Sequence, residues 1–169
     1  GLGFRQYREV KAALGAFDAW LGHHLDQLRR NPGDNLLSQL VTASDEEGVL
    51  DERELKATAG LVLAAGFETT VNLLGNGIVL LHDHPEQRQR LVDQPDLWPN
   101  AVEEVLRVDP PVLLTGRMAL RDTTVGGRPV AEGTMVTTML AGANRDPGVF
   151  ADPAVFDVAR GNARDHISF

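Results

Sequence analysis

The sequence contains no cysteine, and this absence excludes disulfide bonds and thiolate chemistry within its 169 residues. An excess of positive charge is also missing. Lysine and arginine total 16, aspartate and glutamate total 24, and the formal net charge is −8. Because a negatively charged protein repels phosphate groups, neither nucleic acid nor an anionic membrane surface is expected as a partner.

Long hydrophobic runs are missing as well. Gly66, Glu68, Asn72 and Asn76 interrupt the longest apolar stretch, so it falls short of the roughly 18 apolar residues that indicate a membrane helix. The first residues lack an apolar core followed by a small-residue cleavage site, so no export signal is visible. We therefore expect a cytoplasmic protein without a membrane segment.

The composition that remains, 43% hydrophobic and 24% charged, is that of a globular protein. Apolar residues three and four positions apart predict helices throughout residues 1–109. The predicted helices are Tyr7–Arg30, Asn35–Ala43, about 52–82, Glu86–Val92 and Asp96–Val108. Asp51 and Glu54 form a cap pattern at the start of the long central helix. The acidic segment Ser44–Leu50 before it is expected to be an exposed loop.

Residues 110–169 have a different sequence pattern. Short strand-like runs alternate there with glycine-containing turns. The predicted strands are Arg117–Leu120, Thr123–Val125, Pro129–Ala131 and Thr134–Met139. Gly126-Gly127 is a suitable two-residue hairpin turn. No repeat and no long linker is visible, so the prediction is one mainly α domain over residues 1–169, with a small sheet added late.

The segment Leu61–Thr70 is the central stretch of the long helix. Its first part is apolar on all sides, so we expect it to be buried on most sides. Glu68, Thr69 and Thr70 follow it and spread over most of the helix circumference, so at least one of them must point into the protein and needs a polar partner there. Gly66 thins the helix just before them, which leaves room for a flat or bulky partner. The structural alternative is a satisfied core hydroxyl, an ordinary ion pair and a close helix contact.

Glu104 and Arg107 are three residues apart and lie on one face of a predicted helix. Such a pair usually lies on the surface and contributes little to stability. Here apolar side chains surround the pair, which favours a buried position. These neighbours are Ala101, Val102, Val105 and Leu106.

The order of several short motifs resembles the cytochrome P-450 monooxygenases of the soluble bacterial type. The motifs are Ala65-Gly66-x-Glu68-Thr69-Thr70, Glu104-x-x-Arg107, Asp109-Pro110-Pro111-Val112, Gly116-Arg117, Asn144-Arg145-Asp146-Pro147 and Phe156-Asp157-x-x-Arg160. This resemblance covers essentially the whole chain and implies a partial cytochrome P-450 fold.

The resemblance also implies roles for residues near a haem. Glu68 and Thr69 are expected to be the acid and alcohol pair of oxygen activation. Ala65 and Gly66 are expected to leave room beside the cofactor. The residues expected to line the substrate cavity are Leu61, Ala64, Val112, Leu113 and Leu114.

A second group is implied on the other side of the cofactor. Glu104, Arg107 and Arg160 are expected to form a buried structural charge triad that does not react. Arg117 is expected to bind a haem propionate. Phe169 is expected to be the first residue of the haem-binding loop.

The loop itself is where the sequence departs from the family. Relatives continue after the phenylalanine with Gly-x-Gly-x-His-x-Cys, and the cysteine thiolate is the axial ligand. This chain stops at Phe169 and also lacks the family's amino-terminal helices. We therefore expect a fragment that is inactive alone, with haem b bound only in the complete protein and the axial cysteine beyond Phe169.

The function that the resemblance implies is oxidation, for example hydroxylation, of an apolar small molecule with dioxygen and two electrons. The resemblance also implies a ferredoxin and an NAD(P)H-dependent ferredoxin reductase as the electron donors. No dinucleotide fingerprint is visible in this sequence, so nicotinamide binding is expected in a redox partner. Two alternatives stay open. One is a non-catalytic helical binding module that kept the scaffold without haem, and the other is an enzyme that uses peroxide.

Other histidines are weaker candidates. His82 and His84, like His23 and His24, have spacings that do not place two rings on one helix face, so a metal site is not expected at either pair. Asp165, His166 and Ser168 contain the residue types of a hydrolase triad but lack the Gly-x-Ser-x-Gly elbow. We expect His166 to be part of the scaffold that leads into the haem loop.

Overall fold

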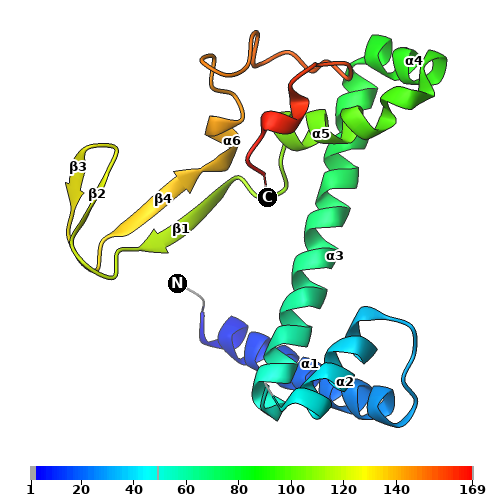
Figure 1. Cartoon of the computed structure of the whole chain (residues 1–169), viewed down its shortest axis with the longest axis vertical. Helices are drawn as coiled ribbons and strands as arrows, with labels where there is room; N and C mark the ends of the chain where they lie inside the picture. Colours follow the sequence, from blue (N-terminus) through cyan, green and yellow to red (C-terminus); the bar gives the residue numbers. More distant parts are fainter. Residues whose placement is uncertain (1–2, 49, 169) are drawn as a thin grey trace. The chain divides into compact units, whose positions relative to one another are not determined.

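The structure is a computed structural model that describes residues 3–48 and 50–168. The chain divides into two compact units, Gly1–Phe67 and Glu68–Phe169. Helix α3 (Glu52–Asp83) begins in the first unit and ends in the second. Figure 1 shows the order of the elements along the chain, which is mainly helical with strands in its later part.

The first unit packs three helical segments around a small apolar core. Helices α1 (Phe4–Arg30) and α2 (Leu36–Glu47) meet the beginning of α3 there. Each helix contributes apolar side chains at helical spacing, which places them on one face. The buried residues of this core are Leu21, Leu25, Val41, Leu55 and Ala59.

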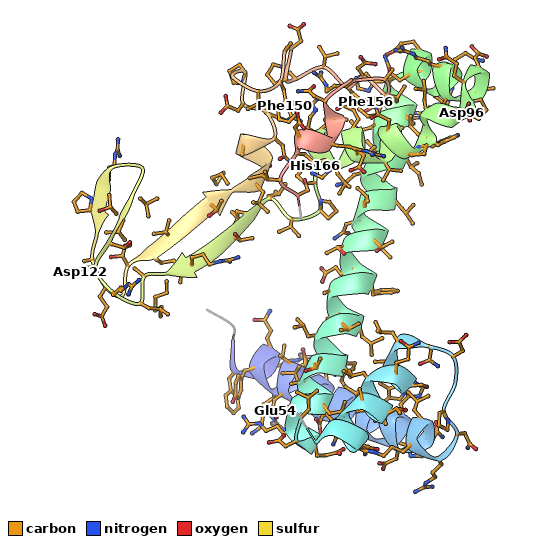
Figure 2. The ribbon with its side chains drawn as sticks, in the orientation of Figure 1. Glu54, Asp96, Asp122, Phe150, Phe156 and His166 are labelled. Atoms are coloured by element: carbon orange, nitrogen blue, oxygen red, sulfur yellow. The ribbon has the colours of Figure 1, made fainter. Side chains whose placement is uncertain are left out.

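The start of α3 has the reciprocal cap that its sequence predicts. The Glu54 backbone N–H donates to Asp51 Oδ1 at 2.8 Å, and the Asp51 backbone N–H donates to Glu54 Oε2 at 2.9 Å. Two amide groups that the helix cannot satisfy internally are thereby bonded. The cap prediction is confirmed, and Figure 2 labels Glu54 at this end of the helix.

Arg29 joins the three helical segments of the first unit. Its guanidinium contacts Asp26 at 3.3 Å, Asp45 at 3.2 Å and Glu52 at 2.8 Å. Hydrogen bonds to Glu52 and Asp45 raise the pKa of Arg29 above its ordinary value. The side chain therefore stays charged and links α1 to the end of α2 and the start of α3.

Helix α2 is longer than predicted, and the expected acidic loop from Ser44 to Leu50 is wrong over its first half. The helix continues to Glu47 and ends at Gly48, whose φ of 63° suits glycine. Ser44 is buried, and its Oγ donates to the Leu50 carbonyl at 3.2 Å. A run of acidic residues indicates solvation but not backbone conformation, so the pattern missed this last helical turn.

The second unit contains the end of α3 and the short helices that follow. These are α4 (Pro85–Asp93), η1 (Pro95–Leu97), α5 (Trp98–Val108), α6 (Leu140–Ala143) and η2 (Ala163–Asp165). The core forms where α4 and α5 meet the loop after α6, as Phe156 in Figure 2 illustrates. Its buried residues are Leu91, Ala101, Val105, Val108, Phe156 and Val158.

Two small antiparallel sheets lie between α5 and α6 in the chain. Strands β1 (Leu114–Met118) and β4 (Met135–Met139) pair with Leu114 opposite Met139, and Figure 1 shows them side by side. Strands β2 (Thr123–Val125) and β3 (Arg128–Val130) form a hairpin.

The turn of this hairpin is the predicted glycine pair. Gly126 and Gly127 have φ values of 55° and 76°, which matches the two-residue hairpin prediction. The predicted strand Arg117–Leu120 is displaced, because β1 begins three residues earlier, at Leu114, where pairing with β4 starts. Pairing partners set strand ends, and local propensity does not reveal them.

Candidate functional site

The central stretch of α3 is exposed in this chain, so the expectation of burial on most sides is wrong here. Leu61 is 69% exposed and Phe67 is 75% exposed. Among the described residues of α3, only Leu55 and Ala59 are buried. An apolar helix face becomes buried only where other elements pack against it. Within the described residues such packing does not enclose the stretch from Leu61 to Gly66.

Helix α3 is also long and apolar enough to cross a membrane, with a mean hydropathy of 1.3 in its most apolar window. Length and composition are weak grounds for a membrane span, because the core helix of a water-soluble protein passes the same test. The length and hydropathy of α3 therefore show that its surface is apolar, and they do not overturn the prediction of no membrane segment.

The predicted acid and alcohol are consecutive on α3. Glu68 is exposed and Thr69 is half-buried. Ala65 precedes Thr69 by four residues and Gly66 precedes it by three, so these small residues share the helix face of the hydroxyl. A β-carbon added to Gly66 meets no atom within 4 Å. A small-residue surface thus lies beside the hydroxyl and the carboxylate.

The remaining predicted pocket residues occupy two places in the sequence. Leu61 and Ala64 lie on α3 and are exposed. Val112, Leu113 and Leu114 lead into β1 and are also exposed. The Ala141 backbone N–H donates to the Leu113 carbonyl at 3.1 Å, which holds this segment against α6.

A separate apolar pocket of about 230 Å³ lies in the second unit, between α3 and α5. It was missing from the sequence prediction because its lining comes from helix faces that look like ordinary core. The residues that line it are Leu73, Leu74, Gly77, Ile78, Leu81, Trp98, Ala101, Val102, Val105 and Phe156.

Glu104, Arg107 and Arg160 lie together in the second unit. Arg107 donates to both Glu104 oxygens, from Nε to Oε2 at 2.7 Å and from Nη2 to Oε1 at 2.8 Å. Arg160 Nε donates to Glu104 Oε1 at 3.1 Å. The side chains of Glu104 and Arg107 are 0% exposed, and that of Arg160 is 9% exposed.

The two arginines of this triad also hold the loop after α6. Arg107 donates to the carbonyls of Asn144, Pro153 and Val155 at 3.1, 2.8 and 2.9 Å. Its guanidinium carbon lies 5.2 Å from the centre of the Phe150 ring, a cation–π contact that the sequence did not suggest. Because these hydrogen bonds are charge-assisted and numerous, the triad holds the irregular backbone of the loop after α6 in place.

Arg117 lies on β1 opposite Val136 and is exposed. Its Nη1 donates to the Gly116 carbonyl at 2.9 Å. Among the residues that the structure describes, no acidic side chain pairs with it. A permanently charged, forked donor without an acidic neighbour suits a carboxylate ligand.

The possible hydrolase triad is not assembled. His166 Nε2 pairs with Glu103 Oε2 at 3.0 Å, and Ser168 Oγ donates to the Leu106 carbonyl at 2.7 Å. The serine hydroxyl is therefore committed to backbone and is not aimed at the ring. Within residues 3–48 and 50–168, no group of three or more potential metal ligands is present. Phe169 lies outside the described residues.

Comparison with known proteins assigns the family. The cytochrome P-450 family profile matches residues 4–96 and 96–165. A putative cytochrome P-450 of Mycobacterium tuberculosis is 55% identical over the whole chain. The chain belongs to the cytochrome P-450 family. It spans 39% of the length of that mycobacterial relative.

Other cytochromes P-450 agree in sequence and in structure. A vitamin D(3) 25-hydroxylase of Pseudonocardia autotrophica is 44% identical over 90% of this chain and 38% of its own length. A cytochrome P-450 in complex with (4-ethylphenyl) dihydrogen phosphate superposes with a TM-score of 0.91 and 35% identity, over 99% of this chain and 42% of that one. A myxobacterial cytochrome P-450 in complex with myristic acid gives 0.90 and 39%, over 99% and 41% of the two chains. The mainly α, partial cytochrome P-450 fold is therefore confirmed.

Membership of the cytochrome P-450 family implies haem, and the described residues offer groups that suit it. A haem has apolar ring faces and two carboxylates. The small residues Ala65 and Gly66 sit in an exposed apolar helix surface, and Arg117 is a cation without an acidic partner among the described residues. Both features match what a haem presents, one to a ring face and one to a propionate. The sequence contains no cysteine that could serve as the thiolate ligand.

Proposed function

We propose that this chain is the central to late part of a bacterial, cytoplasmic haem-dependent monooxygenase. The complete protein would oxidise an apolar small molecule with dioxygen and two electrons. One observation carries the proposal: in a member of the cytochrome P-450 family, Glu68 and Thr69 lie one residue after Ala65-Gly66 on one continuous helix.

The proposed roles divide between protons and cofactor binding. Thr69 Oγ1 would hold a water molecule, and the Glu68 carboxyl group would supply protons through it. Arg117 would bind a haem propionate. When bound, haem b supplies the redox chemistry by which one atom of dioxygen enters the substrate. The thiolate ligand would come from a cysteine that follows Phe169 in the longer protein, which fits a chain spanning 39% of its relative.

The substrate class is proposed from exposed apolar side chains. Leu61 and Ala64 on α3 would line the substrate cavity in the complete protein, and Val112, Leu113 and Leu114 would do the same, because these side chains are apolar and exposed. Relatives named for vitamin D(3) hydroxylation and bound to myristic acid support a hydrophobic substrate. The relative bound to an alkylphenyl phosphate shows that polar groups also occur in ligands of this family.

The electrons would come from a ferredoxin and an NAD(P)H-dependent ferredoxin reductase. The sequence shows no dinucleotide-binding fingerprint, so a separate protein would bind the nicotinamide. A negatively charged chain and the absence of a clustered basic run agree with a partner other than nucleic acid.

The first prediction tests the acid and alcohol pair. In the complete protein, Glu68→Ala and Thr69→Ala should each uncouple reductant consumption from product formation, because proton delivery contributes about 10²–10⁴-fold to such steps. The measurement is product and hydrogen peroxide formed per NAD(P)H consumed, with ferredoxin and reductase supplied.

Thr70→Ala is the matched control, since it removes a neighbouring hydroxyl from the same helix. Coupling should stay near the unchanged protein in this control. If Glu68→Ala and Thr69→Ala also keep full coupling, the proposed proton route is wrong. If the complete protein binds no haem at all, the non-catalytic binding module becomes the better description.

A further inference from the structure

Asn144 is a fully buried amide that connects three parts of the second unit. Its Nδ2 donates to Ser168 Oγ at 2.8 Å and to the Leu106 carbonyl at 3.3 Å. Its Oδ1 accepts from the Ile167 backbone N–H at 2.9 Å. The amide is therefore hydrogen-bonded to Ile167, to Ser168 and to the last turn of α5 at the same time.

The backbone of Asn144 is hydrogen-bonded as well. Its carbonyl accepts from Arg107 Nη1 at 3.1 Å, and Arg107 in turn holds both oxygens of Glu104. A continuous set of buried and partly buried hydrogen bonds thus runs from the charge triad through Asn144 to Ile167 and Ser168. Buried networks in which each member is satisfied make the local geometry specific.

Hydrogen bonds of His166 also hold the segment of residues 166–168 in place. The Ser168 backbone N–H donates to His166 Nδ1 at 3.1 Å, so Nδ1 carries the lone pair and the ring proton lies on Nε2. That proton then points to Glu103 Oε2 at 3.0 Å. The His166 side chain is 5% exposed, and Figure 2 shows it beside η2, next to α5. Only this tautomer satisfies both contacts.

The two neighbouring acidic residues of α5, Glu103 and Glu104, therefore belong to two different sets of interactions. Glu104 pairs with Arg107 and Arg160, whereas Glu103 pairs with His166. Ser168 Oγ adds a bond to the Leu106 carbonyl at 2.7 Å. Three consecutive residues, 166 to 168, are thus bound to α5 and to Asn144 by side chains and backbone together.

We propose that Asn144, with His166 and Glu103, is a positioning set for the cofactor. It fixes residues 166–168, and thereby the start of the loop that carries the axial ligand, against the carboxyl-terminal end of α5. This inference rests on the proposed function, because that function places the ligand shortly after Phe169. Each of the three residues acts by setting where the ligand segment lies.

The test compares Asn144→Ala with Asn100→Ala in the complete protein. Asn100 is a matched control, because its Nδ2 donates to two backbone carbonyls, those of Val158 and Arg160, away from residues 166–168. The first readout is amide hydrogen exchange. Exchange at Ile167 should accelerate about tenfold or more in Asn144→Ala and stay unchanged at that amide in Asn100→Ala.

The second readout is the absorption of the dithionite-reduced protein under carbon monoxide, at a temperature where both variants are folded. Asn144→Ala should show a growing fraction of the shorter-wavelength band of a haem without thiolate ligation, and Asn100→Ala should keep the thiolate band. Ser168→Ala and His166→Asn should shift the band in the same direction, and they keep the test decisive if Asn144→Ala does not fold.

The outcomes separate this inference from the proposed function. If the unchanged protein shows no thiolate band, the proposed function fails. If it shows the band, and Asn144→Ala, Ser168→Ala and His166→Asn match Asn100→Ala in both readouts, the positioning set is rejected while the proposed function stands.

Discussion

At the scale of single residues, Glu104 is the carboxylate that connects both arginines of the triad to α5. Its Oε1 accepts from Arg107, from Arg160 and from the Asp157 backbone N–H, and its Oε2 accepts from Arg107. Among the described residues, no buried side-chain nitrogen or oxygen lacks a hydrogen-bond partner. One carboxylate therefore balances two buried cations, and removing it leaves both of them without a counter-charge.

Glu104→Gln should accordingly lower the free energy of unfolding by about 3–5 kcal/mol, because a neutral amide cannot balance two buried guanidinium groups. Urea unfolding followed by circular dichroism measures this. Glu86→Gln, at an exposed position in the first turn of α4, is the control and should change stability by less than about 0.5 kcal/mol. Equal effects of the two substitutions would contradict a structural role for the triad.

At the scale of elements, α3 is the helix that begins in the first unit and ends in the second. It is 32 residues long, and its first turns are buried against α1 and α2 while its central stretch is exposed. Its first residue is set by the groups that bond the free backbone N–H groups of the first turn. The reciprocal bonds between Asp51 and Glu54 define that residue.

Asp51→Ala should therefore destabilise the protein by about 1 kcal/mol, the usual cost of losing an N-cap side chain. Thermal unfolding would show the change, together with faster amide exchange at Glu54. Asp34→Ala is a suitable control, because Asp34 is exposed and makes no ion pair or hydrogen bond among the described residues. Amide exchange at Glu54 that is the same in both variants would count against the cap.

At the scale of the whole molecule, the chain exposes many large apolar side chains. Leu74, Ile78, Trp98 and Val102 are exposed, and they line or border the pocket of about 230 Å³ between α3 and α5. Large contiguous apolar patches normally mark surfaces that are covered by other structure. The chain spans 39% of its mycobacterial relative, which agrees with this surface being covered in the longer protein.

The 169-residue chain alone should therefore bind a hydrophobic dye such as anilinonaphthalene sulfonate, and the complete protein should bind less. Replacing Leu74 and Ile78 by lysine should lower dye fluorescence of the short chain by about twofold or more, because both side chains belong to the patch. Leu120→Lys removes an exposed leucine outside the pocket lining and should have little effect. Equal loss in both variants would show that the dye does not report this patch.

Much of the local structure could be predicted from the sequence. The cap of α3, the glycine turn between β2 and β3 and the major helices depend on near neighbours in the chain. The last turn of α2 could not be predicted, because it depends on the burial of Ser44 and on Arg29, which lies in another helix. Motif order was enough to indicate the family, since it samples separated positions at once.

The sequence by itself determined the helical character, the family and the spacing that puts Glu104 and Arg107 on one helix face. Only the tertiary structure decided which distant groups meet them. Arg160 reaches Glu104 from 56 residues away, and His166 reaches Glu103 from 63 residues away. Helical spacing specifies contacts three and four residues apart, whereas contacts between distant residues depend on how loops return to the core.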